Sequence, residues 1–549
     1  MNEAIAPPAE VHGKSGGGLV CSTGARHRAI ILHTTGEQPL TRPGEVPQPH
    51  KAELKRDLSK LESYATIIGM LIGSGIFVVT GRLGAVAGPS VPLAYLVLAP
   101  VILATAVAYS VYLSTPLGLR PGDAYLHISR TLQNYYIGYM ALWLKWLAYI
   151  GALVILATSL GQYLKFFYPT MDDWFAAWLP FGQQLKATYA GGPSLGEAAV
   201  ATATILFFFI FNLLGVKFYG WLQTAMFILL LIAVVILIVP GLFAIEWKNF
   251  TPLFPFGFWA TTTAEGDKGF LAALPPLFFS YAGFESLAQT AGETREARRL
   301  LPAVFINGIL ISMLIFFLMS LVAFGTVPYQ ELARSDYAMA DAAHRFLPKW
   351  GGAVVALGAM MAFTTSINGS VFVPARILYV FGEDRMAPRW FARVGERSGT
   401  PWASLVISTT IALALLWTKQ LSSVLNISLV AIFLLYALHS ASMAALPFVR
   451  PKLYKTALVR LRPVWLVIFG ATSVLAMGYL TFMVIARDIS ERRRAGGAAI
   501  WQLLLLWSAV GTALYLFARW EGRRSGFDYK GQLTREWIAE AESMDESTQ

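Results

Sequence analysis

Long apolar segments alternate with short polar ones from about residue 64 to residue 520. A helix needs about 20 mostly apolar residues to cross a bilayer. About twelve segments approach or exceed that length: 64–83, 91–114, 136–166, 197–213, 215–242, 269–291, 301–327, 350–381, 402–417, 423–448, 464–486 and 499–520. The pattern therefore predicts an all-α integral membrane protein, with room for a short surface helix in the loop 328–349.

Two of these segments are interrupted in the middle. Glycine breaks the first one at Gly73 and Gly75, with Ser74 between them, and Gly283 lies in a similar interruption about 200 residues later. Glycine costs about 1 kcal/mol against alanine in a helix interior, and in lipid a freed backbone group must face protein or a water-filled cavity. Two broken segments in corresponding places of two halves indicate the binding site of a secondary transporter.

Composition and charge agree with this interpretation. Of 549 residues, 56% are hydrophobic and only 14% are charged, whereas soluble domains carry about 25% charged residues. The net charge is +11, and the basic residues lie in loops and tails. We interpret them as orientation signals facing lipid headgroups, with both termini cytoplasmic, and not as a nucleic-acid surface. The loop with Arg487 and residues 492–494 opposes that orientation. Cys21 is the single cysteine, so no disulfide or cysteine metal site is expected.

The expected domains follow from the spans. Residues 1–60 form a polar, disordered cytoplasmic tail without a signal peptide, 61–450 a transporter core, 451–520 two peripheral helices and 521–549 a cytoplasmic tail. The chain has no G-x-x-x-x-G-K-[ST] motif, so direct coupling to ATP is not expected. We expect no cofactor and no enzyme activity, because His439 is the only histidine within a predicted span.

Several motifs resemble those of the amino acid–polyamine–organocation (APC) superfamily, in family order from about residue 54 to 450. They are Gly69-x-x-x-Gly-Ser-Gly-Ile-Phe77, Ser110-Val-Tyr-Leu-Ser-Thr-Pro116, Gly122-Asp-Ala-Tyr125, Asn212-Leu-Leu-Gly-Val-Lys217, Phe279-Ser-Tyr-Ala-Gly-Phe-Glu285, Ala291-Gly-Glu-Thr294 and Thr365-Ser-Ile-Asn-Gly-Ser-Val-Phe372. The resemblance implies a five-plus-five inverted repeat (LeuT-like) with broken helices 1 and 6, and transport of amino acids by alternating access, through exchange or proton coupling.

The resemblance also implies a substrate site at the two breaks. Backbone N–H groups at Gly73, Ser74 and Gly75 would receive the substrate carboxylate, which suits the positive end of a half-helix. The α-ammonium group would meet carbonyls of the second break, and Phe279 would gate the site. The expected substrate-binding residues there are Phe279, Ser280, Ala282 and Gly283. The alternative is that these small residues only allow close helix packing.

Four polar positions carry the coupling hypotheses. Glu285 is the proton-coupling candidate, because burial in a span favours the protonated form of a carboxyl; a glutamate at this place is linked to the pH response of arginine/agmatine-type antiporters. Thr365 and Ser366 are candidate sodium ligands, although hydroxyls in membrane helices usually bond to the preceding turn. Lys145 either snorkels or pairs with an acid such as Glu285.

Other functions stay open at this point. The same fold could serve a polyamine or amine exchanger, or an amino acid sensor that does not transport. The sequence also leaves open which amino acid is carried and whether the protein is a homodimer.

Overall fold

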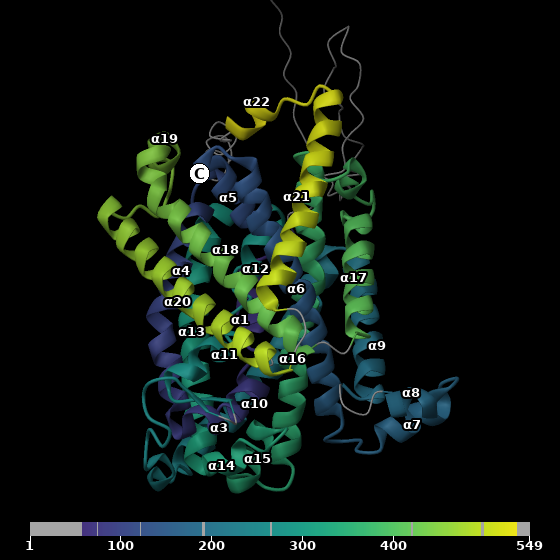
Figure 1. Ribbon diagram of the computed structural model, residues 1–549, viewed down its shortest axis with the longest axis vertical. Coiled ribbons are helices and arrows are strands. Elements are labelled where there is room, and N and C mark those ends of the chain that lie inside the picture. Colours follow the sequence, from purple (N-terminus) through teal and green to yellow (C-terminus); the bar gives the residue numbers. More distant parts are fainter. Residues whose placement is uncertain are drawn as a thin grey trace, which may run out of the picture. The chain divides into compact units, whose positions relative to one another are not determined.

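The structure, a computed structural model, describes residues 57–73, 75–120, 122–188, 193–263, 266–418, 421–495 and 499–534. Long helices run roughly side by side through this part of the chain (Figure 1). Nine of them are continuous: α4 (Val91–Leu113), α6 (Tyr135–Leu164), α9 (Leu195–Leu213), α10 (Val216–Phe243), α13 (Ala297–Thr326), α16 (Gly351–Glu383), α18 (Leu421–Val449), α20 (Pro463–Ala495) and α21 (Ile500–Arg524).

The first and sixth predicted spans are broken. The first consists of α1 (Lys60–Leu71), a π-helical turn η1 (Gly75–Val79) and α2 (Thr80–Arg82), and together they are long enough to cross a membrane. The sixth is divided into α11 (Leu274–Phe278) and α12 (Ser286–Gln289). Among the described residues ten helical segments have the length and composition of a membrane span. The broken sixth segment and the 15-residue α17 (Trp402–Leu416) account for the other two predicted spans.

Short elements connect the spans. They are α3 (Gly84–Ala87), α5 (Asp123–Leu132), α7 (Met171–Trp178), α8 (Gly182–Thr188), α14 (Tyr329–Leu332), α15 (Ala338–Phe346), α19 (Pro451–Lys455) and α22 (Tyr529–Thr534). The loop 328–349, where a short surface helix was predicted, contains two short helices, α14 and α15. α14 buries one of its four residues, whereas α15 buries five of its nine residues. One departure from an all-helical chain is a small antiparallel pair, β1 (Thr261–Thr263) and β2 (Gly266–Lys268), between α10 and α11.

The packing places the broken segments at the centre of the bundle. α1 packs against α10, α13 and α16, and α12 of the second broken segment packs against α1, α13 and α16. α20 and α21 instead expose many large apolar side chains, among them Leu475, Phe482, Leu505 and Leu506. Lipid tails are as apolar as these side chains, so such exposed faces are suited to contact with lipid.

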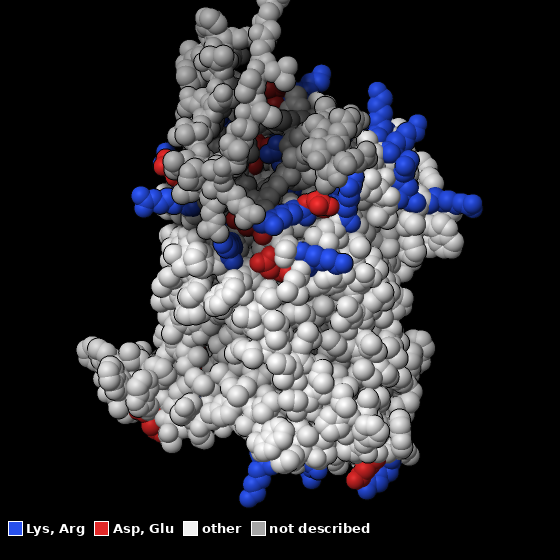
Figure 2. Space-filling view, turned by 180° about the vertical axis from the view of Figure 1, so that it is seen from behind, with Lys and Arg blue, Asp and Glu red and all other residues white. Residues whose placement is uncertain are grey.

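Charged residues separate into two zones with an uncharged belt between them (Figure 2). α19 and α22 lie at the same end of the bundle (Figure 1). Exposed basic residues occur in α19 (Lys452, Lys455), just after it (Arg460, Arg462) and at the end of α21, which leads into α22 (Arg523, Arg524). At the α14–α15 end, Arg82 pairs with Asp336 and Arg345 pairs with Glu331. The chain is therefore a multi-pass membrane protein with a basic excess at the α19 end.

Candidate functional site

The first break begins where α1 ends. The Ile72 N–H donates to the Ile68 carbonyl at 2.9 Å, and then the Ile72 backbone leaves the helical region, with φ −79° and ψ 86°. Gly73 follows, and Gly75 starts the turn η1. Ser74, which we expect to bind substrate, lies outside the described residues.

The second break spans the residues between α11 and α12. The Ser280 N–H donates to the Leu277 carbonyl at 3.0 Å, so the chain tightens into turns after Phe278. Gly283 then takes a φ of +115°, and a Cβ there would lie 3.1 Å from the Met70 carbonyl oxygen. This backbone conformation is open to glycine at little cost and strained for other residues.

The two breaks touch one another. A Cβ on Gly75 would lie 2.7 Å from Ser280 Cβ, so only a hydrogen atom fits there. The Thr80 hydroxyl donates to the Gly75 carbonyl at 3.0 Å and lies 2.6 Å from the Tyr95 hydroxyl, which lies 3.0 Å from Ser280 Oγ. Tyr95 on α4 thus links both breaks.

A pocket lies between the breaks and helices α6, α16 and α18; about 550 Å³ of space there is free of protein atoms, including space that opens to solvent. Of the expected substrate residues, Gly73, Gly75, Phe279, Ala282 and Gly283 line it, together with Glu285. Ser280 is buried and is not among the lining residues. The remaining wall is mostly apolar, with Leu71, Ala152, Leu156, Leu429 and Ile432, and carries four hydroxyls, from Tyr149, Ser366, Ser370 and Ser428.

Glu285 is fully buried. Its carboxylate accepts three hydrogen bonds. The Tyr149 hydroxyl donates to Oε1 at 2.8 Å, and the Gly283 N–H donates to Oε2 at 3.1 Å. The Tyr436 hydroxyl also donates to Oε2. Three donors therefore hold the carboxylate of Glu285 at the edge of the cavity.

Lys145 does not snorkel. It is fully buried in α6, and its ammonium forms an ion pair with Asp123 at the start of α5. The same ammonium lies 3.4 Å from the backbone carbonyl oxygen of Glu285 and does not pair with its carboxylate. Sequence reasoning missed Asp123, although it stands in the Gly122-Asp-Ala-Tyr125 motif. Asp123 therefore adds a second buried carboxylate to the surroundings of Lys145.

His439 has a partner that span counting does not reveal. His127 of α5 lies beside it, with its Nδ1 2.9 Å from His439 Nε2. Both rings stack on Tyr112, at centroid distances of 4.5 and 5.2 Å, and Tyr109 packs 4.1 Å from the His439 ring. A packing role for His439 agrees with this arrangement.

Thr365 and Ser366 face the end of α1. The Thr365 hydroxyl donates to the carbonyls of Gly69 and Ala362, both at 2.8 Å, and the Ser366 hydroxyl donates to Gly69 at 3.0 Å. These oxygens are the donor set that a hard cation prefers. The two hydroxyls nevertheless satisfy the carbonyls without an ion. Among the described residues no cluster of three or more His, Cys, Asp or Glu side chains is placed to hold a metal.

A buried ion pair joins α16 to the segment that follows the second break. Arg376 of α16 lies 3.1 Å from Glu293, and both side chains are about 1% exposed. The Arg376 guanidinium also lies 3.5 Å from the centroid of the Phe372 ring. The Glu293 carbonyl accepts the Leu58 N–H at 3.0 Å, so this pair also fixes the segment that leads into α1.

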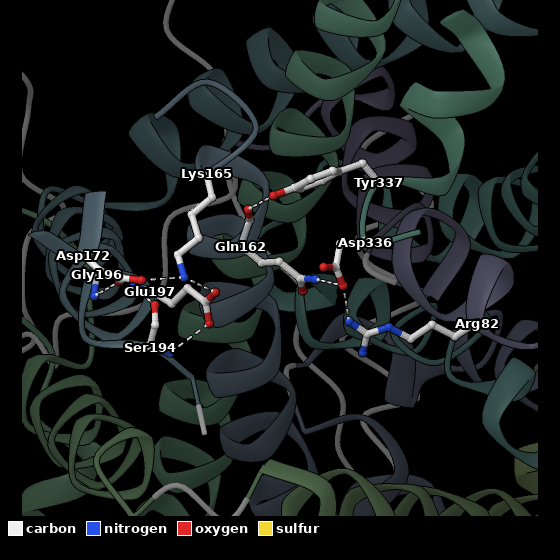
Figure 3. Close-up of polar contacts among 9 residues, drawn as sticks. All are labelled: Arg82, Gln162, Lys165, Asp172, Ser194, Gly196, Glu197, Asp336 and Tyr337. Carbon is white, nitrogen blue, oxygen red and sulfur yellow. Dashed lines mark hydrogen bonds and ion pairs between the residues drawn. The ribbon is translucent and has the colours of Figure 1, made fainter. Parts of the chain in front are cut away.

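A separate polar cluster lies at the α15 end (Figure 3). Lys165 lies 2.9 Å from both Asp172 and Glu197, and the Gly196 N–H donates to Asp172 at 2.9 Å. Burial alone would raise the pKa of Asp172, but hydrogen bonds from Ser194, Lys165 and the Gly196 N–H outweigh it and hold that pKa below 3.8. Burial alone would lower the pKa of Lys165, but its two acidic partners raise it above 10.5.

Two broken helices that meet at a cavity inside a membrane-spanning bundle define a carrier of small molecules. The profile of a family described as amino acid permease matches residues 58–510. The chain belongs to this amino acid permease family.

Three relatives illustrate the similarity. The branched-chain amino acid permease BcaP of Bacillus subtilis (strain 168) is 23% identical over 435 residues, which cover 78% of this chain and 90% of BcaP. The serine/threonine exchanger SteT of the same organism is 25% identical, with 73% and 84% covered. Cationic amino acid transporter 4 of Mus musculus is 26% identical, with 72% of this chain and 61% of the relative covered.

Proposed function

We propose that this chain is a secondary active permease that carries amino acids across the cytoplasmic membrane by alternating access. The single observation that carries the proposal is the cavity where the two broken helices meet, lined by backbone at Gly73, Gly75 and Gly283. Backbone groups freed inside a membrane are tolerated only where they face protein or a cavity. A zwitterionic amino acid offers one acceptor group and one donor group to match them.

The substrate orientation follows from the two breaks. The turn η1 starts at Gly75 and presents its N-terminal end to the cavity, which favours the substrate carboxylate. The α-ammonium group then meets carbonyls of the second break, between Phe279 and Gly283. Phe279 is half-buried and lines the cavity, a placement that supports a gating role. Ser280 contributes by holding the breaks together through Tyr95.

The walls favour a neutral substrate with an apolar side chain. Leu156, Leu429 and Ile432 offer apolar surface, and Glu285 is the one carboxylate among the described lining residues. Its oxygens already accept three hydrogen bonds. A polyamine would need a second carboxylate, and Asp123 is occupied by Lys145. The relative named as a branched-chain amino acid permease supports the same substrate class.

Coupling is proposed to use a proton on Glu285 or exchange with internal substrate. Sodium at Thr365 and Ser366 is the less favoured alternative, because both hydroxyls already donate to carbonyls.

The basic excess at the α19 end supports a cytoplasmic location of that end, and with it of the C-terminal segment. The assignment of residues 451–520 as a peripheral part agrees with their exposed apolar faces. A homodimer and a disordered tail 1–60 remain predictions, and nearly all of that tail lies outside the described residues.

The test is uptake into proteoliposomes of labelled leucine, with arginine and putrescine as comparison substrates. Sodium, proton and internal-substrate gradients are imposed one at a time. We expect leucine uptake driven by internal substrate or by an inward proton gradient, and we expect Glu285→Gln to abolish the proton stimulation. Glu521→Gln, an exposed change, is the control. Bound leucine without uptake under any gradient would refute transport and favour the sensor.

A further inference from the structure

Three fully buried charged side chains link α5, α6 and the second break. Lys145 on α6 forms an ion pair with Asp123 on α5, and its ammonium lies 3.4 Å from the carbonyl oxygen of Glu285. Asp123 and Lys145 are absent from the cavity wall, whereas Glu285 lines it. Lys145 therefore pairs with a carboxylate away from the cavity and also contacts the backbone of Glu285, whose side chain lines the cavity.

The charges of this cluster do not balance. The cluster holds two carboxylates and one ammonium, which leaves one excess negative charge when all three groups are ionised. The other titratable groups that face the cluster are Tyr109 on α4, Tyr149 on α6, Tyr436 and His439 on α18, and His127 on α5. The tyrosines are neutral, and the two histidines hydrogen-bond to each other as a donor and an acceptor, as neutral imidazoles do. An uncompensated buried charge is costly, so the cluster favours uptake of one proton.

The backbone at Asp123 is shaped for this contact. Asp123 has a φ of +47° directly after Gly122, whose φ is +126°. Aspartate is one of the few residue types besides glycine that adopt such a φ at modest cost. One carboxylate oxygen of Asp123 contacts Lys145, and the other, Oδ1, is buried without a hydrogen-bond partner among the described residues. That oxygen can therefore accept a further hydrogen bond, and close packing alone does not explain why it is buried without one.

We propose that Lys145 and Asp123 are positioning residues that set how tightly the Glu285 carboxyl holds a proton during transport. The inference rests on the proposed function and deepens it. Proton uptake forms an O–H bond on Glu285 and leaves the Asp123–Lys145 pair neutral as a unit, and proton release restores the excess negative charge. The positive charge of Lys145 favours the ionised form of Glu285 and therefore opposes proton uptake. The negative charge of Asp123 offsets this effect.

Charge-removing variants test this arrangement because they act in opposite directions. Lys145→Met removes the cation and leaves two carboxylates, so Glu285 holds its proton to higher pH. Asp123→Asn leaves Lys145 free to stabilise the ionised form of Glu285, so proton uptake needs lower pH. We expect the pH of half-maximal leucine uptake to move by about one unit upward and downward, respectively. The double variant has the net charge of the wild type and should return close to the wild-type profile.

The measurement is the pH profile of proton-driven leucine uptake in proteoliposomes, together with leucine exchange at fixed pH. Lys165→Met removes a lysine just beyond the far end of α6 and should leave the profile unchanged. Shifts in the same direction, or no shift, would overturn the inference. If the single variants do not fold, the double variant alone tests the inference. A pH profile of leucine uptake that differs from the wild-type profile by a full pH unit would then overturn it. Wild-type exchange that is indifferent to protons would refute this inference and leave amino acid transport intact.

Discussion

Replacing Gly75 by alanine tests the contact between the two breaks. The new Cβ would lie 2.7 Å from Ser280 Cβ and closer still to Ser280 Cα. Because a backbone atom is involved, the overlap is relieved only if the second break moves away. Overpacking of this kind costs about 1–3 kcal/mol. The displaced residues line the substrate cavity, so the cost falls on substrate binding.

The expected loss follows from this cost. Each 1.4 kcal/mol is a factor of ten in an equilibrium constant, so substrate affinity should fall roughly 5- to 150-fold. Gly478→Ala is the matched control, because a Cβ at this exposed position of α20 meets nothing within 4 Å. That control should be neutral or slightly stabilising, since alanine is favoured over glycine in a helix by about 1 kcal/mol.

Two measurements report on the variants. Leucine uptake into proteoliposomes gives the concentration dependence, and the melting temperature of the purified protein with and without leucine reports binding separately from transport. Folded Gly75→Ala protein that binds and carries leucine as well as Gly478→Ala does would refute the reasoning. It would mean that the breaks tolerate separation and do not form the substrate site.

Three further changes have defined outcomes. Glu293→Gln should lower the stability by about 3–5 kcal/mol, because it leaves the buried Arg376 without its counter-ion, and Arg376→Met in the same chain should recover much of the loss in melting temperature. Asp172, whose pKa is lowered in the folded protein, contributes stability above pH 3.8 that is lost as the pH falls through its folded pKa. Asp172→Asn should therefore flatten the melting-temperature profile in that acid range. Thr365→Ala should weaken uptake equally at all sodium concentrations, whereas a selective loss of sodium stimulation would identify a sodium ligand.

The fold could be predicted from the sequence because a bilayer imposes a strict length on each apolar segment. Twelve spans follow from that rule. The two breaks follow from glycines in the middle of apolar segments, where a continuous helix disfavours glycine. The boundaries were less certain: α20 continues to Ala495, well beyond the predicted 464–486, because a helix does not have to end at the membrane surface.

The backbone part of the candidate site was also predictable, since glycines in the middle of apolar segments mark both breaks. The reason is local at Gly283, with its φ of +115°, whereas Gly75 is needed for its contact with Ser280 of the second break. Side-chain roles were less so. Ser280 was expected to bind substrate on the strength of its position in a motif, but its hydroxyl turns to Tyr95, which stands 185 residues earlier in the chain. A rotation of a broken helix by part of a turn decides whether a side chain faces the cavity, and no periodicity applies within a break.

The partner of Lys145 illustrates the same limit with greater consequence. A lysine about nine residues inside a span must find a counter-charge or reach water, and Glu285 was the acid visible within another span. Asp123 lies in a short helix that the hydropathy pattern does not mark as a span, yet α5 is buried against α6 and α18. Burial of α5 adds a second carboxylate and a second histidine to a region where the sequence indicated one of each. The charge balance that governs proton uptake is therefore a property of the packing of α5, and it can be read only once that helix is placed.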